Sequence, residues 1–289
     1  MATPDQWLEG ARLRTLPAAV APVLVGTGAA AQVGSASVAR ALLAAGVALA
    51  LQVGVNFAND YSDGVRGTDL NRVGPMRLTA SGAARPGQVR AAAVLALGVG
   101  ALLGLALVWL SGHWWLLAVG ALAIAAAWFY TGGRRPYGYL GLGEVGVFLF
   151  FGLVAVLGTT YTQADRITWP SVAGAVGVGL LACALLTVNN IRDVPGDALS
   201  GKRTLAVRIG EHRARRVYAW LVGLALLSGL ACAIVAPGVL LLLLLLVPAG
   251  VLITTVMLGA RGVLLAPVLL GTGLLELGYG VLLGIGLAL

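Results

Sequence analysis

Long apolar runs, separated by short polar segments, occupy almost the whole chain. Each run approaches the roughly 20 residues that an α-helix needs to cross a bilayer, and no polar segment is large enough for a separate soluble domain. The pattern predicts an all-α polytopic membrane protein with about nine transmembrane helices in a single domain, residues 1–289. The predicted spans are 16–32, 38–57, 90–110, 114–130, 142–161, 172–189, 216–235, 239–258 and 263–287.

The composition also indicates an integral membrane protein. Hydrophobic residues make up 59% of the chain and charged residues 10%, and the mean hydropathy is +0.94. A soluble domain carries about 25% charged residues, so this class is excluded. The N-terminal segment before the first span is polar and charged, and we do not expect it to be a cleavable signal peptide.

The net charge of +8 is explained by where the basic residues lie. With nine spans, the N-terminus, the loop 131–141 and two long polar loops, 58–87 and 190–215, fall on one side of the membrane. That side holds 17 of the 19 lysines and arginines, and Arg40 and Arg166 are the exceptions. The positive-inside rule makes this side the cytoplasm and places the C-terminus outside. The basic excess therefore gives no reason to expect nucleic acid as a partner.

A cluster of Asn and Asp residues closes the second apolar run. Asn56, Asp60 and Asp63 are spaced i, i+4 and i+7, so they share one face of a helix. Ionisable groups at a membrane boundary cost desolvation free energy and often mark function. This face is therefore a candidate site.

A second cluster closes the sixth apolar run. Asn189 and Asp193 are again spaced i and i+4. Pro195 disfavours helical conformation at Val194, so we expect a turn just beyond the helix end to present Asp197. Two such clusters, on separate helices at equivalent membrane depth, are what a shared metal–diphosphate site requires.

These residue types suit diphosphate chemistry. Carboxylates alone repel a phosphate, but Mg²⁺ takes oxygens from carboxylates on one side and from phosphates on the other. Neighbouring cations neutralise the remaining phosphate oxygens. Those around the second cluster are Arg192, Lys202 and Arg203, and Lys202 is the only lysine of the chain. The predicted catalytic residues are Asp60, Asp63, Asp193 and Asp197, which with Asn56 and Asn189 are also the predicted metal ligands. The predicted substrate-binding residues in and beside the clusters are Asn56, Asn59, Arg66, Arg77, Asn189, Asn190 and Lys202.

Two other interpretations of the clusters remain open. Capping of a helix end beside a solvated loop explains one cluster far better than it explains two. An ion-coupled transporter also uses intramembrane acids, but it places them at mid-span between broken helices. The clear mid-span acid here is Glu276 in the last run, and Glu144 lies near the start of the fifth.

Several motifs in combination resemble the UbiA superfamily of intramembrane prenyltransferases. Besides the two clusters, they are RLRTLPAAVAP at 12–22, YTGG at 130–133, PYGY at 136–139, GLGE at 141–144 and GKRTLA at 201–206. Within the superfamily they are most similar to the 1,4-dihydroxy-2-naphthoate polyprenyltransferases of menaquinone synthesis. Two positions depart from the family pattern. Gly67 stands where the first motif often has a third Asp, with Asp69 two residues on, and Arg134 stands where the family has a lysine after Tyr130.

The resemblance implies a fold and an activity. The fold would be nine helices around a central cavity in a bacterial cell membrane, with the two long loops capping the cavity from the cytoplasm. The activity would be Mg²⁺-dependent transfer of a polyprenyl group from polyprenyl diphosphate to 1,4-dihydroxy-2-naphthoate, giving demethylmenaquinone, CO₂ and diphosphate. It adds Tyr130 and Arg134 to the substrate-binding residues, and Tyr139 as a candidate in the cavity wall. The alternatives are the same chemistry on another aromatic acceptor, such as 4-hydroxybenzoate, and an ion-coupled transporter.

Overall fold

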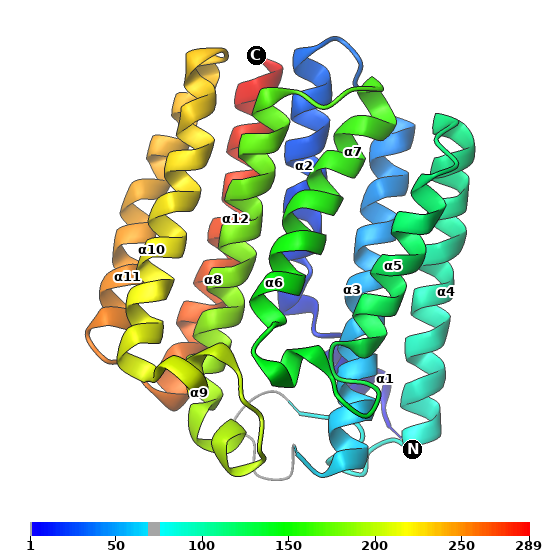
Figure 1. Cartoon of the computed structure of the whole chain (residues 1–289), viewed down its shortest axis with the longest axis vertical. Helices are drawn as coiled ribbons and strands as arrows, with labels where there is room; N and C mark the ends of the chain where they lie inside the picture. The colour runs from blue at the N-terminus through cyan, green and yellow to red at the C-terminus, as the bar shows by residue number, and fades with distance from the viewer. Residues whose placement is uncertain (1, 69–75) are drawn as a thin grey trace.

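The computed structural model, shown in Figure 1, describes residues 2–68 and 76–289 as a bundle of long helices that run side by side. Asp69 lies outside these described residues. The helices are α1 (Pro4–Ala11), α2 (Pro17–Gln32), α3 (Val38–Arg66), α4 (Pro86–Ser111), α5 (Leu116–Phe129), α6 (Gly143–Val147), α7 (Ala155–Ala164), α8 (Trp169–Leu199), α9 (Leu205–Ile209), α10 (Glu211–Leu230), α11 (Leu246–Met257) and α12 (Ala266–Ala288). A π-helical segment, Phe148–Val154, makes α6 and α7 one continuous helix, and 3₁₀ segments lie at Leu13–Thr15, Tyr137–Leu140, Ala231–Ile234, Pro237–Leu245 and Gly262–Leu265.

Most of the predicted spans are long enough to cross a membrane. In the described ranges, seven helical segments are long and apolar enough, and α1 with α2 makes an eighth if its 45° bend belongs to one span. The remaining predicted span is α5, an apolar helix of 14 residues. It is short because Gly112 precedes it with a φ of 78° and Gly133 follows it with a φ of 77°, a conformation that glycine adopts most easily. The all-helical polytopic fold is confirmed, with seven or eight full spans in place of nine.

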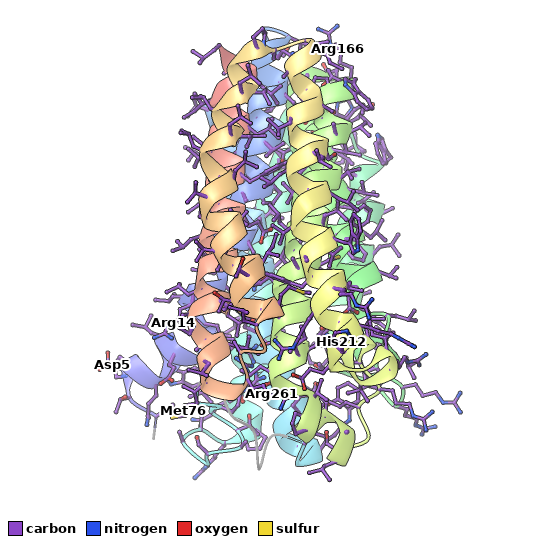
Figure 2. The ribbon with its side chains drawn as sticks, turned by 90° about the vertical axis from the view of Figure 1, so that its left-hand side faces the viewer. Asp5, Arg14, Met76, Arg166, His212 and Arg261 are labelled. Carbon is purple, nitrogen blue, oxygen red and sulfur yellow. The ribbon has the colours of Figure 1, made fainter. Side chains whose placement is uncertain are left out.

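The polar loops gather at one end of the bundle. Figure 2 shows Arg14 and Arg261 near this end and Arg166 at the opposite end. Arg40 lies at the same end as Arg166, where its guanidinium donates to the carbonyl oxygen of Leu110 at 2.9 Å. Arg40 and Arg166, the two predicted exceptions, therefore lie at the end opposite to Arg14 and Arg261, as the sequence predicts. Which end faces the cytoplasm stays a prediction.

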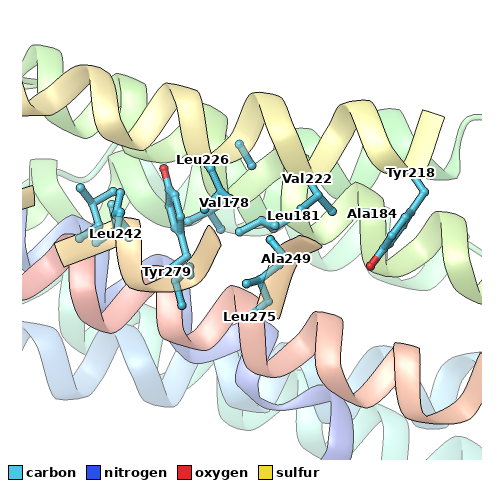
Figure 3. Close-up of a cluster of buried hydrophobic side chains, with 14 of the residues drawn as sticks. Val178, Leu181, Ala184, Tyr218, Val222, Leu226, Leu242, Ala249, Leu275 and Tyr279 are labelled. Atoms are coloured by element: carbon cyan, nitrogen blue, oxygen red, sulfur yellow. The ribbon is translucent and has the colours of Figure 1, made fainter. Parts of the chain in front are cut away.

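The helix α8 is the most deeply buried span, with 72% of its apolar window inside the bundle. It packs against α10 and α12, and Figure 3 shows Val178 of α8, Val222 of α10 and Leu275 of α12 in one cluster. Small residues let the helices approach closely. A Cβ atom at Gly177 would lie 1.9 Å from the hydroxyl oxygen of Tyr279. This tight packing fixes the position of α8 and of the acidic residues at its end.

Two helices extend beyond the predicted span ends. The helix α3 continues to Arg66, and Gly67 ends it with a φ of 73°. The helix α8 continues through Pro195 to Leu199, so the predicted turn at Asp197 is wrong. Pro195 lies near the end of α8, where its missing N–H removes one backbone hydrogen bond from the helix. Each acidic cluster therefore lies on the last turns of a long helix.

Candidate active site

One large cavity of about 1630 Å³ runs through the bundle. It reaches from Asp197 and Lys202, at the end where the loops gather, to Trp115 and Tyr161 near the opposite end. Its walls come from α2, α3, α4, α5, the α6–α7 helix, α8 and the start of α12. A cavity that is charged at one end and apolar along most of its length can hold a molecule with a charged head and an apolar tail.

The first acidic cluster divides into a part that lines the cavity and a part that does not. Asn59 and Asp63, spaced i and i+4 on α3, both line the cavity. Asp60 is buried outside the described lining, where its Oδ2 accepts from the backbone N–H of Leu78 at 2.8 Å and its Oδ1 from that of Thr79 at 2.9 Å. In this arrangement Asp60 does not share the cavity lining with Asp63, and its predicted role in metal binding and catalysis stays a prediction. Asp60 anchors the loop that precedes α4, and Asn59 takes its place in the cavity.

Asn56 lies one helical turn before Asp60. It lines the cavity, but its Nδ2 donates to the carbonyl oxygen of Ala11 at 2.9 Å and to the hydroxyl of Thr15 at 3.0 Å. These contacts fasten the N-terminal segment to α3. Asn56 therefore has a structural role in this arrangement, and its predicted role as a metal ligand stays a prediction.

Asp63 is buried and holds a cation from the second long loop. Lys202 Nζ lies 3.2 Å from Asp63 Oδ2, and both side chains are less than a tenth exposed. The hydroxyl of Tyr139 donates to Asp63 Oδ1. Asn59 Oδ1 accepts from the hydroxyl of Thr131 at 2.7 Å. The first pair of oxygen ligands is thus held by residues from two other loops.

The second cluster is organised along α8 itself. Asp193 and Asp197, spaced i and i+4, both line the cavity, and so does Asn189. Arg192 immediately precedes Asp193 in sequence. Its Nε and a terminal nitrogen contact Asp193 Oδ1 and Oδ2 at 2.7 and 3.0 Å. The same terminal nitrogen donates to Asn189 Oδ1 at 2.8 Å. Asn190 lines the cavity too and donates to Glu144 Oε1 at 3.1 Å.

Tyr139 is the point where three loops meet. Its hydroxyl contacts Asp63, its backbone carbonyl accepts from the N–H of Arg203 at 3.0 Å, and its ring lies under Lys202 Nζ at 4.8 Å and near the Arg66 guanidinium at 5.5 Å. Burial, followed by the negative charge of Asp63, raises the pKa of Tyr139 well above its ordinary value. The hydroxyl therefore stays protonated and keeps donating to the carboxylate.

The remaining predicted residues fall into two groups. Arg77 is buried and lines the cavity, as does Tyr130. Arg66 instead donates to the backbone carbonyl oxygens of Thr131 and Gly133, and Arg134 is exposed, outside the described cavity wall. The resemblance to the family places a phosphate-binding cation at Arg134. In this structure Lys202 and Arg192 are the cations beside the carboxylates.

Two lining arginines, Arg12 and Arg14, are absent from the predicted site. Arg192, which also lines the cavity, is one of the cations expected around the second cluster. Arg12 has a positive φ of 54° at the end of α1, and no local pattern predicts that the bend there turns the chain toward the cavity. Glu276, the mid-span acid, is fully buried in α12 away from the described lining, and neither carboxylate oxygen has a hydrogen-bond partner among the described residues.

The oxygen donors at the charged end suit Mg²⁺ bound together with a diphosphate. Among the described residues, no three His, Cys, Asp or Glu side chains form a metal cage. Mg²⁺ bound with phosphates needs no such cage, because one or two carboxylates suffice when phosphate and water complete its octahedron. Asn59 with Asp63, and Asp193 with Asp197, offer such sets on facing helices. Asp63 pairs with Lys202 and Asp193 with Arg192, so each carboxylate lies beside a cation that could also contact phosphate oxygens.

Comparisons with known proteins agree with this geometry. Residues 19–267 match the UbiA prenyltransferase family. The chain belongs to this family. It is 57% identical over 225 residues to the 1,4-dihydroxy-2-naphthoate octaprenyltransferase of Mycobacterium tuberculosis, covering 78% of this chain and 77% of that one. It is 42% identical over 232 residues to the enzyme of the same name from Escherichia coli, covering 78% and 74%.

The fold of the UbiA family has been seen in solved structures. A UbiA homologue from Archaeoglobus fulgidus bound to GPP and Mg²⁺ aligns with a TM-score of 0.63 over 95% of this chain and 98% of that one, at 14% identity. The fold implied by the sequence resemblance is confirmed, and the chain is a multi-pass membrane protein of the UbiA family. Which residues of this chain bind metal and substrate stays a prediction.

Proposed function

We propose that this protein transfers a polyprenyl group from polyprenyl diphosphate to 1,4-dihydroxy-2-naphthoate, with loss of CO₂. The relatives from M. tuberculosis and E. coli carry the name of this activity with an octaprenyl donor. The observation that carries the proposal is the division of the cavity. Two sets of carboxylate and amide oxygens and several cations line one end, and an apolar wall continues from them through the bundle.

The two substrates fit this cavity by their chemistry. The diphosphate belongs at the charged end, where Lys202, Arg192 and Arg77 can contact its oxygens. The prenyl tail belongs along the apolar wall. The aromatic acceptor has to reach the allylic carbon next to the diphosphate, and Tyr130 and Tyr139 line the cavity there.

The reaction needs little chemistry from the protein beyond placement. Asn59, Asp63, Asp193 and Asp197 would hold Mg²⁺, which when bound compensates the charge of the departing diphosphate. Lys202 and Arg192 exchange their carboxylate contacts for phosphate oxygens as the substrate binds. Tyr139 keeps Asp63 oriented throughout. The apolar wall excludes water, so that the allylic carbon meets the acceptor ring before it meets water.

The bonds and electrons of the transfer balance without an oxidant. The ring forms a carbon–carbon bond to the allylic carbon, and the bond from that carbon to the diphosphate oxygen breaks with its electron pair on the diphosphate. The ring–carboxyl bond then breaks, its electron pair returns to the ring, and CO₂ leaves. The direct product is the quinol form of demethylmenaquinone.

The decisive experiment compares two acceptors. Purified protein in detergent, with Mg²⁺ and octaprenyl diphosphate, is given 1,4-dihydroxy-2-naphthoate or 4-hydroxybenzoate, and prenylated product and CO₂ are both followed. We expect product and CO₂ from the naphthoate and loss of both on adding EDTA. Product from hydroxybenzoate alone would overturn the acceptor assignment. The absence of product from either acceptor, together with ion-driven flux in vesicles, would support a transporter instead.

The same proposal places the charged end of the cavity in the cytoplasm. Both native cysteines are buried, so single cysteines can be introduced on an otherwise unreactive background. Leu199→Cys lies in the exposed surface of the charged end, and Arg166→Cys lies at the opposite end. In intact cells, an impermeant maleimide should label Arg166→Cys and spare Leu199→Cys. The reverse pattern would overturn this orientation.

A further inference from the structure

The apolar part of the cavity has a defined wall and a defined far end. Along the α6–α7 helix, the lining residues Val147, Phe150, Val154, Leu157 and Tyr161 recur at helical spacing and form one stripe. An α-helix over residues 147–161 would rise about 21 Å, and the stripe is somewhat shorter because Phe148–Val154 is π-helical. The described charged lining residues all lie at the other end of the cavity, beside the two acidic clusters. The stripe is therefore suited to an apolar chain that leads away from a diphosphate.

Tyr161 closes this stripe within an aromatic cluster. Its ring centroid lies 4.4 Å from that of His113 and 5.7 Å from that of Trp115, and the latter pair meets edge to face. His113 Nε2 lies 2.7 Å from Asp165 Oδ1. These contacts join the turn before α5 to the end of α7, so Tyr161 is held from two sides. We call Tyr161, His113 and Trp115 the outer cluster.

The opposite wall of the cavity is linked to the α6–α7 helix at both of its ends. This wall is α5, which packs against α3 and α4 although none of its residues is fully buried. At the charged end, the hydroxyl of Tyr137 donates to the carbonyl oxygen of Ala126 at 3.0 Å. At the far end, Trp115 contacts Tyr161. Between these two bridges, α5 and the α6–α7 helix present mainly apolar side chains to the cavity.

We propose that the outer cluster is a specificity-determining element that sets how long a prenyl tail the cavity accommodates. The inference rests on the proposed function, because it needs a prenyl diphosphate anchored at the acidic clusters. A geranyl tail, with two isoprene units, is much shorter than the stripe and ends before Tyr161. An extended octaprenyl tail is longer than the stripe. A long tail therefore meets the outer cluster and has to bend or leave the bundle there.

The test compares tail-length profiles of variants. kcat/KM is measured with prenyl diphosphates of two to nine isoprene units, and the length with the largest value is recorded. Tyr161→Ala and Trp115→Ala should each move this maximum to longer tails by at least one isoprene unit. They should raise the ratio of kcat/KM for octaprenyl over geranyl diphosphate by about threefold or more, since relieving one apolar contact is worth this much in a binding pocket.

Two control variants separate length selection from general damage. Tyr161→Phe keeps the ring contacts and should keep the wild-type maximum. Trp109→Ala removes an exposed tryptophan of α4 that is outside the described cavity wall, and it should leave the profile unchanged. Profiles of Tyr161→Ala and Trp115→Ala that superimpose on the wild type would overturn the proposal. A loss of equal size at every tail length would overturn it too.

The inference can fail separately from the proposed function. Displacement of radiolabelled geranyl diphosphate by longer prenyl diphosphates, with no acceptor present, reports tail length without requiring transfer to a naphthoate. If the wild type forms no naphthoate product while the displacement profile still shifts in Tyr161→Ala, the acceptor assignment fails and the outer cluster stands. If the wild type forms product and neither profile shifts, only the outer-cluster proposal fails.

Discussion

The two acidic pairs at the charged end have the same spacing but different neighbours. Asp63 receives its cation from Lys202, which is 139 positions away in sequence, and its hydrogen bond from Tyr139. Asp193 receives its cation from Arg192, the residue immediately before it. Asp63 of α3 is therefore contacted by two loops that are distant in sequence, whereas the described cation of Asp193 comes from its neighbour on α8.

This difference indicates that one side of the site is rigid, while the other side depends on a loop contact that a ligand can replace. The Asp193 side stands on the most deeply buried helix of the bundle, so its geometry is set before any ligand arrives. On the Asp63 side, the ion pair with Lys202 holds the loop after α8 against the end of α3. If a diphosphate replaced the carboxylate as the partner of Lys202, this tie would be released. Substitutions on the two sides should therefore have different consequences.

The largest effects are expected at the carboxylates themselves. Asp63→Asn and Asp193→Asn keep the size of the side chain and remove the charge that attracts the metal. Each should lower kcat by about 10³-fold or more, because compensation of the leaving-group charge is lost. Steady-state prenyl transfer measures this, with circular dichroism as the check on folding. A variant with near wild-type kcat would remove that carboxylate from the site.

Substituting the two cations should distinguish the Asp63 pair from the Asp193 pair more sharply. Lys202→Ala and Arg192→Ala should each raise the KM for the prenyl diphosphate by about 10- to 100-fold, the range expected when one charge-assisted hydrogen bond is lost. Lys202→Ala should also loosen the loop after α8, because its ion pair holds that loop against Asp63 of α3, whereas the Arg192–Asp193 contact joins neighbouring residues of α8. Hydrogen exchange of the backbone amides at 200–204 measures this loosening. Equal exchange in both variants would contradict the distinction.

Tyr139→Phe should have a smaller effect, on the Asp63 side alone. The phenyl ring keeps the stacking under Lys202 but loses the hydrogen bond to the carboxylate. Loss of such an orienting partner costs about tenfold in metal affinity. The Mg²⁺ concentration that gives half-maximal activity should therefore rise by about this factor. Because the pKa of Tyr139 is raised, its ionisation should not lower activity as the pH increases to 9. A Mg²⁺ dependence like that of the wild type would show that Tyr139 does not orient Asp63.

Asp60→Ala should lower the stability of the fold and should have the smallest effect on kcat of these substitutions. It leaves the buried N–H of Leu78 and the N–H of Thr79 without their acceptor, which costs about 2 kcal/mol of folding free energy. The midpoint of thermal unfolding in detergent should fall, while exposed Asp5→Ala leaves it unchanged. An unaltered midpoint combined with lost Mg²⁺ dependence would return Asp60 to the metal site.

Hydropathy and motif spacing were sufficient for most of the fold and for the two helix ends that carry the site. They predicted Asp63, Asp193 and Asp197 at the cavity because these residues follow apolar runs of membrane length. They could not distinguish Asp60 from Asn59. Adjacent residues on a helix point about 100° apart, and only the position of the loop at Leu78 shows which one faces the cavity.

The other differences arise where packing overrides local preference. Pro195 disfavours helix locally, but α8, whose core residues up to Ile191 are buried in the bundle, continues past it to Leu199 through mostly exposed residues. The pairing of Lys202 with Asp63, and the ring of Tyr139 between them, depend on three loops that are distant in sequence. No spacing rule joins such positions. The exposed position of Arg134 likewise follows from how the loop after α5 turns.

The most direct test of the central claim is a binding measurement on the two acidic pairs. Radiolabelled geranyl diphosphate is titrated against purified wild type, Asp63→Asn, Asp193→Asn and Asp60→Asn, with and without Mg²⁺. We predict that Mg²⁺ strengthens binding to the wild type and to folded Asp60→Asn, and that this gain is lost in Asp63→Asn and in Asp193→Asn. Mg²⁺-dependent binding that survives in both of those variants would contradict a metal–diphosphate site shared by the ends of α3 and α8.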